Sequence, residues 1–131
     1  MIVTLVTAGL LGLVFFVLSW RVVQVRQKAQ VSLGDGGDAL LLQRIRAHAN
    51  FAEYVPICLI LLAAIEVSSL AVSPMLVVAG LGLVVVRVAH AIGMAKDGAN
   101  RWRIAGAAGT WTVMLGLSIW ALGLAIALIG Q

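Results

Sequence analysis

Long apolar segments separated by short polar connections dominate the pattern along the chain. Four such segments cover residues 2–29, 39–69, 74–95 and 103–129. A helix that spans the hydrocarbon core of a bilayer needs about 20 mostly apolar residues, so each segment is long enough to cross once. The pattern therefore predicts an all-α protein, an integral membrane four-helix bundle in which residues 1–131 form a single transmembrane domain.

The connections contain residues that are typical of helix boundaries. Residues 34–38 read Gly-Asp-Gly-Gly-Asp, a turn that places Asp38 as the N-cap of the second helix. The cluster does not end in Gly-Lys-Ser/Thr, so it does not predict a phosphate-binding loop. Pro74 follows a break at residues 68–73 and suits the first turn of the third helix. A third connection, at residues 96–100, precedes the last helix.

Composition strengthens the membrane assignment. Hydrophobic residues make up 63% of the chain and charged residues only 11%, whereas soluble domains carry about 25% charged residues. The net charge is +4, but the basic residues flank the apolar segments instead of forming one soluble face. We therefore expect membrane lipid, and not nucleic acid, to be the partner of this surface.

The basic residues also predict the orientation in the membrane. Except for Arg87, they flank the first and third connections: Arg21, Arg26, Lys28, Arg44 and Arg46, and then Lys96, Arg101 and Arg103. By the positive-inside rule, these two connections face the cytoplasm and both termini face the opposite side. No basic residue precedes Arg21, and the first apolar segment is longer than a signal-peptide core. We expect it to be retained as an anchor.

The head of the second apolar segment is polar. Arg46, Asn50 and Glu53 share one face of a helix, and Tyr54 lies close to that face. His48 points elsewhere. Ionisable residues inside membrane segments are rare and by default mark a functional site. A guanidinium binds carboxylates, an amide both donates and accepts, and a carboxylate accepts from ammonium groups, so this polar stripe suits a zwitterionic peptide such as glutathione.

Further cations are expected at the same end of the bundle. Arg87 and His90 lie one turn apart in the third segment, and Arg101 and Arg103 open the fourth. Arg26 closes the first segment. These cations outnumber the single carboxylate of the polar stripe, so the site favours an anionic ligand.

A structural interpretation of the same residues is the alternative. In it, Arg46 and Glu53 pair with each other or with Arg87 and hold the helices together. Glu66, at the far end of the second segment, has no expected partner and is expected to be structural or interfacial. Cys58 is the single cysteine, so it is expected to be a small buried hydrophobe without a disulfide or a metal site.

Small residues recur in the first and last segments. They are Gly9, Gly12, Ala105, Gly109, Gly116 and Gly123. Small side chains let membrane helices approach closely, so these positions predict a tightly packed bundle, with contacts inside one chain or between copies of it.

Residues 46–56, Arg-Ala-His-Ala-Asn-Phe-Ala-Glu-Tyr-Val-Pro, resemble the helix-two signature of the MAPEG family (membrane-associated proteins in eicosanoid and glutathione metabolism). The Arg-x-x-x-Asn-x-x-Glu core with its following proline carries the resemblance. Residues 24–26 (Gln-Val-Arg) and 87–90 (Arg-Val-Ala-His) extend it, and it covers essentially the whole chain. Residues 34–37 and 101–103 bring the chain closest to the small bacterial inner-membrane branch of the family.

The resemblance implies a homotrimer in the bacterial inner membrane that binds glutathione, as co-substrate, between subunits near the cytoplasmic face. By position, it assigns the glutathione contacts to Arg26, Arg46, His48, Asn50, Glu53, Tyr54, Arg87 and His90. It also implies that Arg101 or Arg103 stabilises the glutathione thiolate, because a nearby guanidinium lowers the pKa of a thiol from its usual value of about 8.5. Ala49 and Met94 replace an arginine of the prostaglandin synthase and a tyrosine of several members, which argues against that synthase activity.

Two functions follow from these residues. The first is a glutathione transferase or peroxidase that acts on a lipophilic electrophile from the bilayer. The alternative is a non-catalytic membrane protein whose polar stripe is structural or thiol-sensing. A small proton-coupled exporter is disfavoured, because its carboxylate usually lies in the first helix and residues 2–23 contain no acidic side chain.

Overall fold

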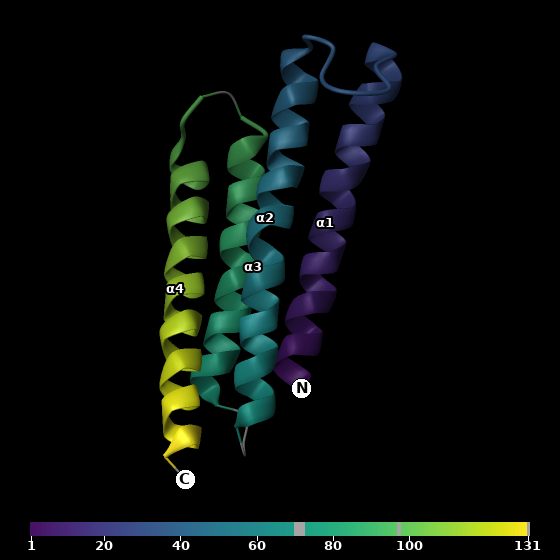
Figure 1. Cartoon of the computed structure of the whole chain (residues 1–131). Coiled ribbons are helices and arrows are strands. Elements are labelled where there is room, and N and C mark those ends of the chain that lie inside the picture. Colours follow the sequence, from purple (N-terminus) through teal and green to yellow (C-terminus); the bar gives the residue numbers. More distant parts are fainter. Residues whose placement is uncertain (70–72, 97, 131) are drawn as a thin grey trace.

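The computed structural model of the chain is a bundle of four long helices (Figure 1). It describes residues 1–69, 73–96 and 98–130. The helices are α1 (Ile2–Ala29), α2 (Ala39–Ser68), α3 (Pro74–Met94) and α4 (Arg101–Ile129). Each is long and apolar enough to cross a membrane. The predicted all-α membrane four-helix bundle is therefore confirmed.

The helix ends lie within two residues of the predicted ones, and the start of α4 differs most. This helix begins at Arg101 instead of residue 103, because Asn100 caps it. The Asn100 Oδ1 accepts a hydrogen bond from the backbone N–H of Arg103 at 3.1 Å, and its Nδ2 donates to the Gly93 carbonyl at 2.9 Å. Residues 70–72 and 97, within the predicted connections at 68–73 and 96–100, lie outside the described residues.

Asp38 begins α2 as predicted. Its Oδ1 accepts a hydrogen bond from the backbone N–H of Leu41 at 2.8 Å. We expect Asp38→Ala to lower the free energy of unfolding in detergent by about 1 kcal/mol, because that N–H loses its acceptor. Asp35→Ala is the matched control, since the Asp35 side chain accepts from the exposed loop N–H of Gly37 and caps no helix in the described structure. An equal loss in the two variants would contradict the capping role.

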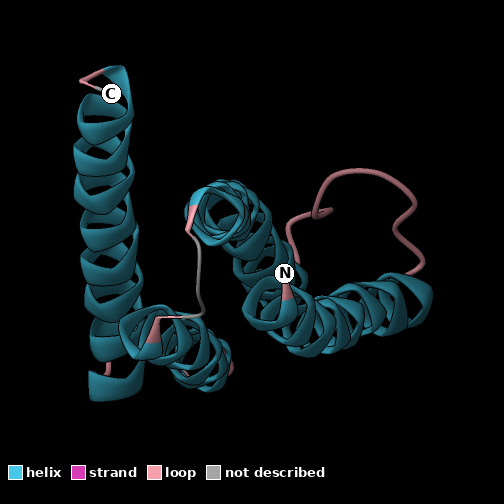
Figure 2. Ribbon diagram, turned by 90° about the horizontal axis from the view of Figure 1, so that it is seen from below, coloured by secondary structure: helices cyan, strands magenta, loops and turns pink. Residues whose placement is uncertain are grey.

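The outer helices α1 and α4 lie on opposite sides of α2 and α3 (Figures 1 and 2). α1 packs on α2 and α3, and α4 packs on the same two helices, but α1 and α4 do not touch within the described part of the chain. Because the four helices alternate in direction, the α1–α2 and α3–α4 connections lie at one end of the bundle, and both termini lie at the other (Figure 1).

Apolar side chains fill the interior and also cover the outside. One buried cluster includes Leu11, Phe51 and Leu83, and a second cluster nearer the termini includes Leu62 and Leu117. On the outer surface the exposed side chains include Phe16, Val85 and Ile119, at 67%, 67% and 63% exposure. Helices that are apolar on every side are typical of a lipid environment. Cys58 is buried, as expected.

Glycines bring α3 and α4 together. A Cβ added to Gly106 would lie 2.5 Å from the backbone nitrogen and from the Cβ of His90, and one added to Gly93 would meet the backbone of Arg103. Such distances are possible only without a side chain, so these two glycines determine how closely the helices approach.

The small residues expected to mediate packing are mostly on the outside. Gly109 is at a helix contact, where an added Cβ would meet Val86. An added Cβ would meet no atom within 4 Å in the described structure at Gly9, Gly12, Gly116 and Gly123. The expectation is therefore wrong for these four glycines within the described part of the chain, because no neighbouring helix comes within contact distance of them.

The expectation that Glu66 has no partner is also wrong. Its carboxylate accepts hydrogen bonds from the backbone N–H groups of Val3 and Thr4, at 2.9 and 2.8 Å, and from the Thr4 hydroxyl at 2.6 Å. The first N–H groups of a helix have no partner inside that helix. Glu66 of α2 therefore caps α1, which is a structural role.

Candidate functional site

The polar stripe of α2 carries an exposed ion pair. The Arg46 Nη2 lies 3.9 Å from the Glu53 Oε1, and the two side chains are 57% and 50% exposed. Their spacing of seven residues places them on one face, as the helical period requires. This is the pair that the structural interpretation expects, and a pairing of Glu53 with Arg87 is not formed in the described structure.

Asn50 lies between these two charges along α2 and turns toward the interior. Its Oδ1 accepts hydrogen bonds from both terminal nitrogens of Arg87, each at 3.1 Å. Arg87 is only 1% exposed, and its Nη1 also donates to the Thr110 hydroxyl at 3.4 Å. Asn50 thus links α2 to the buried Arg87 of α3, which also contacts Thr110 of α4.

The aromatic residues near the stripe lie toward α1. His48 stacks on Phe15 of α1, with ring centroids 4.6 Å apart, and Phe15 stacks on Phe51 at 5.4 Å. His48 therefore points away from the polar stripe, as its position on the helix indicates. Tyr54 is half-buried.

His90 of α3 is enclosed within the helix bundle. It is 4% exposed and packs against the backbone at Gly106 of α4. Arg87, one turn earlier, is enclosed as well. The helical pattern of α3 places both on one face but does not reveal that this face is turned toward α4.

The arginines that open α4 are exposed and lie beside the end of α3. The Arg101 guanidinium lies 5.7 Å from the ring centre of Trp102. The backbone of Arg103 contacts Gly93 of α3. Both side chains stand at the end of the bundle that carries the basic connections.

Arg26 lies on the other side of the bundle. Its Nη1 donates to the Gly34 carbonyl at 2.8 Å, which ties the end of α1 to the following loop. Because α1 and α4 do not touch within the described residues, Arg26 of α1 lies apart from Arg101 and Arg103 of α4.

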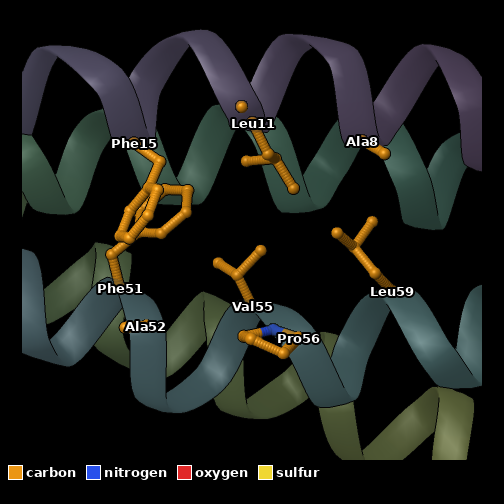
Figure 3. Close-up of a pocket in the computed structure, with 9 residues that line it drawn as sticks. Ala8, Leu11, Phe15, Phe51, Ala52, Val55, Pro56 and Leu59 are labelled. Carbon is orange, nitrogen blue, oxygen red and sulfur yellow. The ribbon is translucent and has the colours of Figure 1, made fainter.

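An apolar groove of about 210 Å³ lies between α1 and α2 (Figure 3). Leu11 and Phe15 of α1 face Phe51, Val55 and Leu59 of α2 across it. Small side chains leave the space open, since Ala8, Gly12 and Ala52 also line the groove. No sequence motif indicated this groove, because its small residues resemble packing positions.

The acidic, cysteine and histidine side chains do not gather. In the described ranges 1–69, 73–96 and 98–130, no group of three such residues is placed to hold a metal ion. The polar side chains of the stripe itself offer guanidinium, carboxylate, amide and phenol groups.

Comparison with known proteins gives a family and bacterial relatives. The sequence model of the MAPEG family matches residues 4–123. The chain is 34% identical over 108 residues to the inner membrane protein YecN of Escherichia coli strain K12, a match that covers 82% of this chain and 81% of the relative. YecN of Escherichia coli O6:H1 matches equally well. No solved structure matches the chain.

Proposed function

Because the chain belongs to the MAPEG family, we propose that it binds glutathione and conjugates it to, or reduces with it, a lipophilic electrophile from the bilayer. One observation carries this proposal. Arg46 and Glu53 form an exposed ion pair in a membrane helix, with the Asn50 amide between them. Exposed charges in such a helix are costly unless they face a ligand, water or another protein surface.

The charges of the polar stripe match those of glutathione. A guanidinium binds a carboxylate through two parallel hydrogen bonds, which suits Arg46 for a terminal carboxylate of the peptide. The Glu53 carboxylate accepts from an ammonium group, and Asn50 and Tyr54 offer neutral hydrogen-bonding groups. Binding would replace the 3.9 Å contact between Arg46 and Glu53 with contacts to the two ends of the ligand.

A site that uses every proposed residue requires more than one subunit. Arg26 lies on α1, and Arg101 and Arg103 lie on α4, on opposite sides of the subunit (Figure 2). Adjacent subunits of a homotrimer would bring α4 of one copy to α1 and α2 of the next. The thiol would then lie near Arg101 or Arg103, whose positive charge favours the nucleophilic thiolate.

We also propose the location. The relatives named above are inner membrane proteins, and the basic connections share one end of the bundle. The positive-inside rule assigns that end to the cytoplasm, so cytosolic glutathione reaches the polar stripe directly. The lipophilic substrate enters from the hydrocarbon side, where the α1–α2 groove has apolar walls.

Glutathione titration of the purified protein in detergent tests this function, with the ultraviolet band of the thiolate as the signal. Saturable binding with a thiolate signal at neutral pH supports an activated nucleophile. Saturable binding without the thiolate supports the alternative of a non-catalytic, thiol-sensing protein. Absence of binding at millimolar glutathione contradicts the proposal and leaves the polar stripe with a structural role.

Arg46→Ala is expected to weaken glutathione binding about 10- to 100-fold, the value of one or two hydrogen bonds to a charged group. Arg44→Ala is the matched control, because Arg44 lies on the same helix two residues earlier and outside the polar stripe. Equilibrium titration with glutathione measures the dissociation constant of both variants. Equal glutathione affinities of the two variants would show that Arg46 does not contribute to the site.

A further inference from the structure

We propose that Arg87 is a positioning residue that holds the Asn50 side chain with its N–H donors turned toward the ligand. This inference rests on the proposed function, since it assigns a role at the same glutathione site. It differs from a direct contact between Arg87 and glutathione, because the guanidinium is only 1% exposed. Arg87 acts through Asn50.

The contact between the two side chains fixes which end of the amide faces inward. Both terminal nitrogens of Arg87 lie 3.1 Å from the Asn50 Oδ1. A guanidinium carries only donors, so the amide atom that faces it is the carbonyl oxygen. The opposite orientation would place N–H donors against N–H donors at the same distance, which is unfavourable.

Neutral groups hold the guanidinium itself in place. The Thr110 hydroxyl donates to the Gly106 carbonyl at 2.7 Å and accepts from the Arg87 Nη1 at 3.4 Å. The Phe51 ring centre lies 5.1 Å from the Arg87 Cζ. Among the described residues, Arg87 makes no ion pair. Its charge is therefore directed at the Asn50 carbonyl instead of being neutralised by a carboxylate.

The close approach of α3 and α4 makes this arrangement possible. At Gly106 the absent side chain allows the backbone of His90 to lie against α4. Thr110, one turn further along α4, is thereby brought within reach of Arg87. A contact between two helices thus determines the orientation of an amide on a third helix.

This orientation leaves the Asn50 amide N–H groups as hydrogen-bond donors in the polar stripe. Within the described residues the Asn50 Nδ2 makes no hydrogen bond, and Asn50 lies between Arg46 and Glu53 along α2. Its two N–H groups are left to donate to a ligand acceptor, a carboxylate or a peptide carbonyl. A cation bound to the carbonyl oxygen also polarises the amide and strengthens its N–H donors.

Two threonines of α4 give a matched test. Thr110 and Thr112 make the same hydrogen bond to the carbonyl four residues earlier, at 2.7 and 3.0 Å, but only Thr110 reaches Arg87. We expect Thr110→Val to weaken glutathione binding about 3- to 10-fold, the value of one ordinary hydrogen bond. Thr112 is exposed, and Thr112→Val should bind glutathione with the affinity of the wild type. Glutathione titration and thermal unfolding without glutathione are measured for both.

A second pair tests Arg87 itself. Arg87→Lys keeps a donor for the Asn50 carbonyl, whereas Arg87→Met has similar length and no donor. We expect the lysine variant to retain more of the glutathione affinity than the methionine variant. A merely structural role predicts lower thermal stability with unchanged affinity in the folded protein.

The outcomes separate this inference from the proposed function. If the wild type binds glutathione and Thr110→Val binds equally well, the positioning role is overturned and the glutathione site stands. Equal affinities of the folded Arg87→Lys and Arg87→Met proteins overturn it as well. If the wild type does not bind glutathione, both proposals fail.

Discussion

Gly106→Ala is expected to lower the free energy of unfolding in detergent by about 3 kcal/mol, the upper end of the usual cost of overpacking. The added Cβ would lie 2.5 Å from the backbone nitrogen of His90. A backbone atom cannot rotate away as a flexible side chain can, so α3 and α4 must separate. Thermal or denaturant unfolding, followed by circular dichroism in one detergent, measures the loss.

Gly116→Ala on the same helix is the control for that substitution. A Cβ at Gly116 would meet no atom within 4 Å in the described structure. The variant should be neutral or slightly stabilising, because alanine favours a helix over glycine by about 1 kcal/mol. Similar stabilities of the two variants would mean that α3 and α4 do not approach as closely as Gly106 allows. Separation of α3 and α4 would also move Thr110 away from Arg87. The affinity for glutathione should therefore fall in Gly106→Ala and stay unchanged in Gly116→Ala.

Glu66→Ala is the second substitution with a large expected effect, a loss of about 3 kcal/mol in the free energy of unfolding. The carboxylate accepts from two backbone N–H groups and one hydroxyl of α1, at Val3 and Thr4. A hydrogen bond to a charged group contributes about 1.5–3 kcal/mol, and the expected loss is smaller than the sum of three because water can replace part of the lost bonds at the end of the helix. Hydrogen exchange of the first turn of α1 should rise together with the loss of stability.

Glu53→Ala provides the comparison, measured without glutathione. Its carboxylate is half-exposed and makes one long contact with Arg46 at 3.9 Å. Exposed ion pairs contribute about 0–1 kcal/mol, so the stability should change little. A loss as large as that of Glu66→Ala would favour the structural interpretation of the polar stripe over the glutathione site.

Much of the fold was predictable because it depends on local sequence. Apolar length alone indicates each membrane span, and Asp38 and Pro74 mark helix starts by their own backbone chemistry. The missed start of α4 also had a local signal, since Asn100 is a preferred N-cap residue. The spacing of Arg46 and Glu53 on one face of α2 likewise followed from the helical period.

The tertiary structure alone decided which side of each helix faces a neighbour. In a soluble bundle the apolar face marks the interior, but here Phe16 on the outside and Leu11 on the inside are equally apolar. The sequence therefore could not assign Gly106 to a helix contact and Gly116 to the outside. Nor could it pair Glu66 with Thr4, or Arg87 with Asn50 and Thr110, because these partners come from distant helices. Their contacts depend on the rotation of each helix about its axis, which packing within the bundle determines.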